Sequence, residues 1–579
     1  MRGFAKAAFL LPALLATACC AVDVMPVDEL AAGMKGVART VFSGYAVEEL
    51  PIEILGVMKA YSAQRDMVLV RCGGSSVERT GVFAGMSGSP VYVDGRLVGA
   101  LAYTFEFIRE PIAGVTPISE MQPVLERRGG ASRAPLSREQ TARILSSPFS
   151  PKWLTLTREP LRVAQLKELP LSICVSHGGA WLGELATSLG GVAAIGGGAA
   201  PSEGFELVPG ASVSVPIVSG DMDASAAGTL TAIDGERLLA FGHPIFGAGA
   251  VSLPLAPAYV HTIVPSQSCS FKLASSAVPF GTVLRDDDPG LGCISGVLPE
   301  TTHVEVLVRG EDGERQYKFE LVKDPVIGPL ALGWTLAGCL QQNLRTAGMA
   351  TIRYVGSLEL AGGTSVPLSG AIAEKSSPIG VLGRILTSYL LLVRNPFEDV
   401  SIDGIKLAFD VREETTAASI RSAWLEPARA RRGERVTVTA ELAPYGNGDE
   451  SVSMEFTVPE DAPIGKLAVT VTDGGSAPFI RQAHSPGRFS PTTLPQLVEV
   501  LSEIDPGTSL YLFVETGRMG VNRDGLDYPN LPGSLVGLMG AEGRSGVSPV
   551  RSMVEASVDT DWVLAGTHTV FLEVIDGEN

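Results

Sequence analysis

The stretch Gly85-Met-Ser-Gly-Ser-Pro90 lies between two runs of sequence that read as β-strands. Met67 to Arg71 precedes it, and Val91 to Tyr103 follows it as a predicted hairpin with an Asp-Gly turn. Its glycines allow a sharp turn and a close approach of the backbone to a ligand. The pattern places Ser87 as a candidate nucleophile, with the N–H groups of Gly85 and Ser87 as candidate oxyanion donors. The alternative is a Gly- and Ser-rich turn without chemistry.

Flanking residues lengthen this motif into a family resemblance. Thr80 to Ala100 (TGVFAGMSGSPVYVDGRLVGA) and Gly114 to Met121 (GVTPISEM) closely resemble the nucleophile segment and the closing segment of the SpoIVB family of serine peptidases. The loop itself is similar to the Gly-Asp-Ser-Gly-Gly-Pro loop of trypsin-like peptidases, with Ser87 at the nucleophile position. The resemblance implies a serine endopeptidase with a specific protein or peptide substrate, and it implies no metal and no cofactor.

A histidine segment of the same family lies further along the chain. Gly228 to Asp234 and Phe241-Gly-His-Pro-Ile-Phe-Gly247 resemble it, and His243 matches the family's catalytic histidine. Phe280 to Asp286 and Gly290 to Gly296 resemble a later block. Because a free serine is a poor nucleophile at neutral pH, it needs a base, and His243 is the candidate. The alternative is a turn histidine that bonds to the backbone.

The order of the two segments is reversed relative to SpoIVB and to trypsin-like peptidases, since Ser87 precedes His243. The two barrel halves therefore look exchanged, as in a circular permutation. Geometry rather than chain order defines a catalytic triad. The prediction requires two barrels that dock with Ser87 and His243 at their interface.

The third member of a triad is not evident. The family pattern places an aspartate shortly before the nucleophile, but Arg71 to Val77 contains no aspartate, and Asp66 lies further upstream. In trypsin-like peptidases the orienting aspartate lies in the histidine's own barrel, which makes Asp286 the candidate and Asp221 its rival. Asp286 to Asp288 also fits a solvated turn. A Ser-His dyad and a site that has lost its activity are the other interpretations.

Composition bounds the class of protein. A chain of 579 residues is too long for a single hydrophobic core, and this length predicts three or four domains. Its 66 Gly and 39 Pro favour short strands joined by turns. The formal net charge of −18, with no basic motif, argues against nucleic-acid binding.

The predicted fold is mainly β, with two trypsin-like β-barrel halves in permuted order followed by C-terminal β-sandwich-like modules. The sequence predicts a buried amphipathic helix from Pro325 to Leu344, further helices at Glu139 to Ser146 and Trp181 to Leu189, and a partner-binding or structural function for the C-terminal region. The predicted units are a signal peptide over 1–21, the nucleophile barrel over 31–128, a connector over 129–204, the histidine barrel over 205–322, a helix with strands over 323–412, and the sandwich-like modules over 413–579.

The N-terminus predicts export to the periplasm or secretion. Arg2 and Lys6 precede an apolar run, Ala7 to Ala18, that ends in small residues. A lipoprotein anchor at Cys19 is the alternative. Beyond this signal the sequence predicts no membrane span, and it predicts an envelope protein partner that binds through the C-terminal region.

The remaining cysteines show no metal-binding spacing. A Cys269–Cys293 disulfide and buried free thiols are both compatible with the sequence. Two rival functions complete the prediction: a catalytically inactive, peptidase-like module for binding or assembly in the envelope, and a protein that processes only itself.

Overall fold

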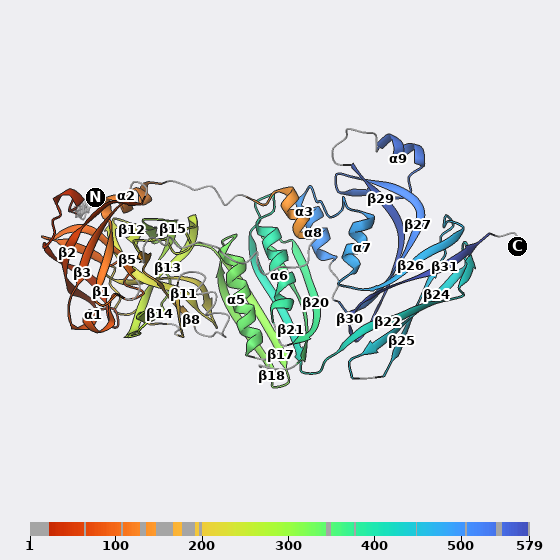
Figure 1. The fold of residues 1–579 in the computed structure, drawn as a ribbon, viewed down its shortest axis with the longest axis horizontal. Helices are drawn as coiled ribbons and strands as arrows, with labels where there is room; N and C mark the ends of the chain where they lie inside the picture. Colours follow the sequence, from red (N-terminus) through yellow and green to blue (C-terminus); the bar gives the residue numbers. More distant parts are fainter. Residues whose placement is uncertain are drawn as a thin grey trace, which may run out of the picture.

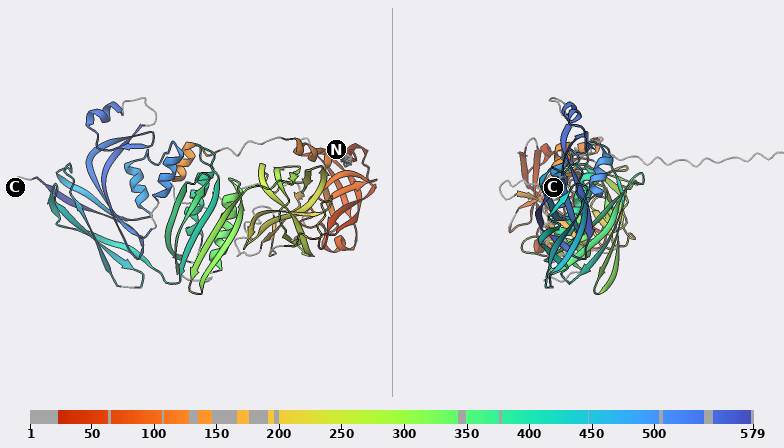
Figure 2. Two further views of the ribbon diagram at one scale, coloured as in Figure 1. Left: turned by 180° about the vertical axis from the view of Figure 1, so that it is seen from behind. Right: turned by 90° about the vertical axis from the view of Figure 1, so that its right-hand side faces the viewer.

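A computed structural model of the chain shows a row of four modules (Figure 1). The first barrel lies at one end and the C-terminal sandwich at the other, and the view from behind shows the same succession (Figure 2). The structure describes residues 23–62, 65–105, 108–127, 135–145, 166–175, 191–195, 200–342, 349–375, 378–446, 448–503, 507–539 and 547–576. The predicted signal peptide and the predicted helix from Trp181 to Leu189 lie outside the described residues.

The first module is a closed barrel of six antiparallel strands. Alternating aliphatic residues on these strands point inward, as the burial of Val68 and Val70 illustrates. The turn at Asp94-Gly95 has positive φ at both residues, which suits the twist of a two-residue hairpin. The barrel closes because the last strand pairs with both neighbours. In barrel order the strands are β1 (Lys35–Val41), β2 (Val47–Ser62), β3 (Arg65–Cys72), β6 (Ile112–Pro117), β5 (Arg96–Phe105) and β4 (Pro90–Val93).

The second module is another closed barrel of six strands, and β14 (Phe271–Ser276) is paired to its longest strand. The predicted mainly β fold with two trypsin-like halves is therefore confirmed. In barrel order the strands are β10 (Ser212–Gly220), β13 (Gly249–Val264), β15 (Gly281–Asp287), β16 (Gly290–Ser295), β12 (Arg237–Ala240) and β11 (Ala224–Asp234).

The described parts of residues 129–204 do more than connect the barrels. β7 (Leu166–Glu168) extends the first barrel at β5, β8 (Leu171–Val175) pairs with β11 of the second, and β9 (Gly191–Ile195) runs parallel to β8. Before them, α3 (Arg138–Leu145) lies far from the first barrel, beside the helices of the later modules (Figure 1). This stretch therefore contributes strands to both barrels and a helix to the third module.

The third module is a five-stranded sheet that continues from β10 of the second barrel. Two helices cover it, α5 (Ile327–Gln341) and α6 (Pro378–Val393). Every residue of α5 from Ile327 to Leu340 is buried, so the predicted amphipathic character was wrong. A helix that is apolar on all sides is buried between layers rather than at a surface. The strands are β18 (Gly313–Val322), β17 (Thr301–Gly310), β21 (Ile402–Arg412), β19 (Met349–Leu360) and β20 (Ser365–Lys375).

The C-terminal module is a β-sandwich with its own apolar core. Helix α7 (Ala477–His484) packs on its strand β29 (Val547–Asp559), and α9 (Gly533–Met539) lies on a projecting lobe (Figure 1). Helix α8 (Leu494–Ser502) instead packs on the third module, where Leu497 and Leu501 join the core. One sheet contains β25 (Glu450–Thr457), β24 (Arg435–Pro444), β22 (Ala417–Glu426) and β30 (Val563–Ala565). The other contains β23 (Arg429–Arg431), β31 (Thr567–Ile575), β26 (Gly465–Asp473), β27 (Ser509–Arg523), β28 (Leu526–Tyr528) and β29 (Val547–Asp559).

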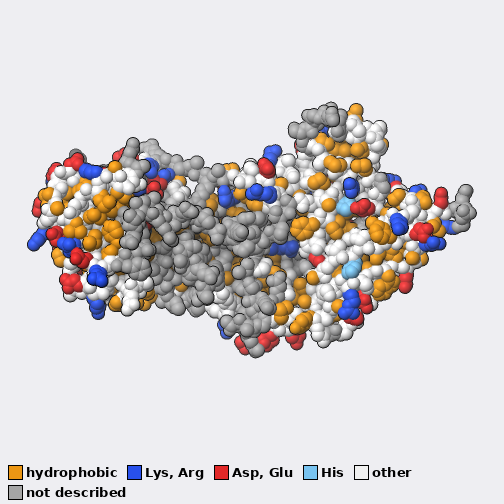
Figure 3. Space-filling model, viewed as in Figure 1, with side chains coloured by type: hydrophobic (Ala, Val, Ile, Leu, Met, Phe, Trp, Pro, Cys, Tyr) orange, Lys and Arg blue, Asp and Glu red, His pale blue; other side chains and the backbone are white. Residues whose placement is uncertain are grey.

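On the face shown in Figure 3, acidic and basic side chains are interspersed, and apolar side chains gather on the lobe that carries α9. No disulfide joins Cys269 and Cys293. Within the described ranges, no helix has the length and apolar composition that a membrane crossing requires. The same ranges contain no cluster of His, Cys, Asp and Glu suited to a metal ion.

Candidate active site

The loop that carries the candidate nucleophile, residues 81–89, is called the nucleophile loop. It follows α1 (Ser75–Thr80) and leads into β4, where the two barrels meet. Ser87 is fully buried in it. Gly85 and Gly88 have φ values of 94° and 93°, a left-handed backbone that favours glycine. The sequence therefore places glycine where the loop has to turn on either side of the serine.

The second barrel fixes the shape of this loop. Four carbonyl groups of the loop accept hydrogen bonds from strands β11 and β14, and one threonine provides two of the donors. In loop order these bonds are Lys272 N–H to Ala84 O (2.9 Å), Thr229 Oγ1 to Gly85 O (3.1 Å), Thr229 N–H to Ser87 O (2.8 Å) and Thr231 Oγ1 to Gly88 O (2.8 Å). The loop therefore depends on the docking of a barrel that lies far away in the sequence.

Around the serine, the N–H groups of residues 84–89 fall into two classes. The N–H of Met86 donates to the carbonyl of Phe83, and the N–H of Gly88 donates to the carbonyl of Leu101. By contrast, no acceptor for the N–H of Gly85 or Ser87 is found in the part of the chain that the structure describes. In a trans peptide the N–H and the preceding C=O point in opposite directions. Because the carbonyls before these two N–H groups are bound, the orientation of the two peptide planes that carry these donors is fixed.

His243 lies in the loop after β12, and it is also buried. Its Nδ1 lies 2.8 Å from the carbonyl oxygen of Pro244. A carbonyl only accepts, so Nδ1 carries the proton and Nε2 of the neutral ring carries the lone pair. Phe241, two residues earlier, has a φ of 68°, an uncommon backbone for a bulky residue that often marks a functional turn. The ring therefore has the tautomer that a general base for serine needs.

The two predicted segments come together at the barrel interface. A Cβ atom on Gly88 would lie 2.5 Å from the backbone nitrogen of Phe241, so the serine loop touches the strand end that carries His243. On the other side, Thr116 Oγ1 donates to the carbonyl of Gly242 at 2.7 Å. The Ser87 hydroxyl itself has no hydrogen-bond partner among the described residues, so it is not bonded to His243 in this arrangement.

Asp286 anchors the loop that follows the histidine. Its carboxylate accepts hydrogen bonds from the backbone N–H groups of Ile245, Phe246 and Ala248, at 2.7, 2.8 and 3.1 Å. Three such bonds fix the path of the backbone immediately after His243. The structure thus gives this aspartate a loop-shaping contact, whereas the Nδ1 of the ring faces the Pro244 carbonyl.

The rival aspartates bond elsewhere. Asp66 accepts from the N–H of Ala60 and pairs with Lys59, and Asp221 accepts from the N–H of Lys318. Asp66 therefore connects the start of β3 to β2, and Asp221 connects the second barrel to the third module. Neither contact involves the histidine loop.

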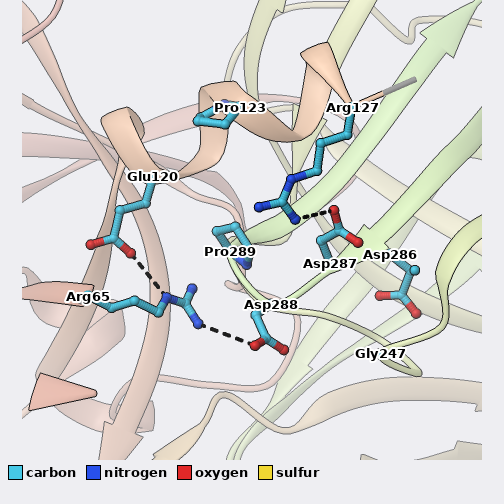
Figure 4. Close-up of a pocket in the computed structure, with 10 residues that line it drawn as sticks. Arg65, Glu120, Pro123, Arg127, Gly247, Asp286, Asp287, Asp288 and Pro289 are labelled. Carbon is cyan, nitrogen blue, oxygen red and sulfur yellow. Dashed lines mark hydrogen bonds and ion pairs between the residues drawn. The ribbon is translucent and has the colours of Figure 1, made fainter. Parts of the chain in front are cut away.

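A pocket of about 470 Å³ lies beside the histidine loop, between the barrels (Figure 4). Its walls come from α2 (Ile118–Glu126), the start of β3, the turn between β15 and β16, and the loop after His243. Arg65 pairs with Glu120 at 3.2 Å, and Arg127 pairs with Asp287 at 2.9 Å across the barrel junction. The pocket is lined by both signs of charge and has room for a side chain of a bound peptide.

Sequence reasoning missed Lys272, Thr229 and Thr231. The amine of Lys272 is completely buried, and burial lowers the pKa of Lys272 to about 7. The signal in the sequence is the alternation along β14, which places Lys272 on the same buried face of the strand as Ala274. That alternation shows only that the side chain points inward, and not what it meets there.

Comparisons with known proteins agree with the nucleophile segment. Residues 18–121 match the family model described as SpoIVB peptidase S55. The match covers the first barrel and ends before the histidine segment, and it confirms the predicted resemblance to SpoIVB-type serine peptidases. Searches of curated proteins and of solved structures find no match to this chain.

We expect Gly88→Ala to destabilise the docked barrels by roughly 2–5 kcal/mol, because strain at positive φ adds to overpacking. The added Cβ would lie 2.0 Å from the Thr229 carbonyl oxygen, which is backbone and cannot rotate away. Urea unfolding measures the loss. Gly81→Ala is the control, since Gly81 also has a positive φ but has nothing within 4 Å of the added atom. Equal losses in the two variants would contradict the steric argument.

Asp286→Asn should loosen the loop after His243 and lower the free energy of unfolding by about 1.5–3 kcal/mol. The reason is that a neutral amide replaces the charged carboxylate that accepts the backbone hydrogen bonds. Hydrogen exchange of residues 244–249 should accelerate. The control is Asp234→Asn, a change at an exposed ion pair with Arg237 that is expected to cost at most about 1 kcal/mol. Unchanged exchange in the first variant would show that the carboxylate does not hold the loop.

Lys272 should make stability depend on pH. Between pH 7 and 10.5 the unfolded chain holds a proton on this lysine that the folded chain lacks, so stability rises with pH by at most about 1.4 kcal/mol per unit. Lys272→Met removes that dependence. Its stability relative to wild type, from urea unfolding, should therefore be higher at pH 6.5 than at pH 9.5. The same difference at both pH values would exclude a lowered pKa.

Proposed function

We propose that this chain is an exported serine endopeptidase of the SpoIVB type that cleaves a specific protein substrate. The observation that carries the proposal is that, within residues 84–89, no acceptor among the described residues is found for the N–H groups of Gly85 and Ser87, while the N–H groups of Ala84, Met86, Gly88 and Ser89 are bonded. A Gly- and Ser-rich turn without chemistry has no need of such an arrangement. The match of residues 18–121 to the peptidase family supports the same reaction class.

In the proposed reaction, the Oγ of Ser87 forms a bond to the carbonyl carbon of the substrate while its proton passes to Nε2 of His243. The N–H groups of Gly85 and Ser87 stabilise the negative oxygen that results. His243 then returns the proton to the leaving amine as the C–N bond breaks, and water hydrolyses the acyl-enzyme in the same way. The Ser87 hydroxyl has to turn toward Nε2 when substrate binds, as often happens between free and bound enzymes.

The Pro244 carbonyl holds the Nδ1–H tautomer of His243 in the proposed reaction. The family resemblance implies an enzyme that makes one specific cut. The pocket between α2 and the turn after β15 is the proposed site for a substrate side chain.

Labelling with a fluorophosphonate probe tests the proposal. Wild-type protein should react, and both Ser87→Ala and His243→Ala should lower the rate at least about 100-fold, because each removes part of the acyl-transfer machinery. Ser89→Ala is the matched control: it removes a second buried hydroxyl without a partner, two residues away, and labelling should persist. Loss of labelling in Ser89→Ala alone, or no reaction in wild type, would overturn the proposal.

A binding module without catalysis is the second candidate. The C-terminal sandwich exposes large apolar side chains, including Tyr445, Leu538 and Phe571, at 67%, 66% and 59% exposure. This second candidate function places an envelope partner on this module. If wild type resists the probe while the protein is folded, this function replaces the peptidase. A comparison of the mature mass of wild type and Ser87→Ala separates self-cleavage from action on other proteins.

A further inference from the structure

Lys272 is a completely buried lysine whose amine contacts hydroxyl groups. Its Nζ lies 3.3 Å from Thr40 Oγ1 on β1 of the first barrel and 3.3 Å from Thr229 Oγ1 on β11 of the second. Within the described residues, no carboxylate forms an ion pair with it, and burial is the cause of its lowered pKa. A buried amine without a counter-charge costs stability, and an apolar side chain of similar length would be cheaper. Stability therefore does not explain why a lysine stands here.

The position of the side chain gives a better explanation. A Cβ atom on Gly85 would lie 2.9 Å from Cδ and 3.0 Å from Cγ of Lys272, so the stem packs directly against the Gly85 backbone. The backbone N–H of Lys272 also donates to the carbonyl of Ala84. That carbonyl belongs to the same peptide group as the Gly85 N–H, so the bond aims this N–H away from β14.

The amine acts on the neighbouring peptides through Thr229. The hydroxyl of this threonine has one hydrogen, which it donates to the Gly85 carbonyl, so its oxygen accepts from the lysine. The backbone N–H of Thr229 holds the Ser87 carbonyl. The lysine thus supports the residue that contacts the loop on both sides of Met86. A neutral amine still has two N–H donors, so both hydroxyl contacts survive deprotonation.

We propose that Lys272 is a positioning residue for the oxyanion hole: its stem, its backbone N–H and its amine together hold the peptides that present the Gly85 and Ser87 N–H groups. The groups that face its amine are the hydroxyls of Thr40 and Thr229, and the thiol of Cys174 lies near its backbone carbonyl. This inference rests on the proposed peptidase function, because only acyl transfer needs the hole.

The test compares Lys272→Met with wild type in the full-length protein. We expect the substitution to leave stability unchanged or raise it, and to lower the labelling rate. Stability to urea at pH 6.5 is unchanged or higher, because a buried amine is gone, while the second-order rate of fluorophosphonate labelling falls about tenfold or more, because the hole has lost its support. The labelling rate of Lys272→Met should also be lower than that of wild type at pH 9, since the neutral amine of the wild-type lysine still supports the loop. Hydrogen exchange in the peptide 83–91 accelerates.

Thr40→Val is a second variant that keeps the shape of the side chain and removes only one acceptor for the amine. Its labelling rate should fall about threefold. If Lys272→Met does not fold, this variant tests whether the contacts of the Lys272 amine support the loop. Lys323→Met is the control, because Lys323 forms ion pairs with Glu300 and Asp403 in the third module. Its labelling rate should match that of wild type.

The outcomes separate the two proposals. A labelling rate within twofold of wild type in folded Lys272→Met, with unchanged exchange in 83–91, would show that the lysine is only packing. If wild type does not react with the probe at all, the peptidase proposal fails, and faster exchange in the variant then still shows that Lys272 holds the loop. Unchanged exchange in that case rejects both.

Discussion

The nucleophile loop is held from outside its own barrel, and the rest of the site depends on this constraint. Thr229, Thr231 and Lys272, all on the second barrel, bond to the loop carbonyls from Ala84 to Gly88. Each bond satisfies a buried polar group whose desolvation would otherwise be costly. Docking of the barrels and assembly of the site are therefore one event, because the loop lacks these partners in an isolated first barrel.

Glycine makes this close docking feasible. At Gly88 the Thr229 carbonyl and the Phe241 backbone approach so closely that no side chain fits, and at Gly85 the stem of Lys272 occupies the space. The same closeness puts the serine loop against the strand end that leads to His243. Asp286 then fixes the backbone beyond the histidine. The two segments that the sequence singled out are therefore held in contact by backbone hydrogen bonds and by side chains of the second barrel.

The later modules are joined to the barrels through shared layers. β18 pairs with β10, so the third module continues the sheet of the second barrel, and one apolar core runs through both. The short segment with α3 comes after the first barrel and packs on the third module, where the N–H of Leu136 donates to the carbonyl of Arg394. The histidine barrel is thus supported on both sides, whereas the C-terminal sandwich keeps a separate core.

Much of the fold was predictable because its signals are local. The strand-like apolar run from Met67 to Val70, the Asp94-Gly95 turn and the abundance of Gly and Pro predict short antiparallel strands, and the structure contains them. The position of the α5 helix was predicted, but its burial on all sides was not, since that burial depends on the layers around it. The strands within 166–195 were missed, because their pairing partners lie in the barrels rather than nearby.

For the candidate site, the sequence by itself singled out the serine, the two glycines and the histidine, since each lies in a motif whose residue types the proposed chemistry requires. Only the tertiary structure decided what Asp286 and Lys272 do. A carboxylate in a turn and a lysine on a strand have no role until another segment supplies their partners. Hydrogen bonds between residues far apart in the chain leave no periodic trace in the sequence, so the groups that hold this site in shape become visible only when the barrels are docked.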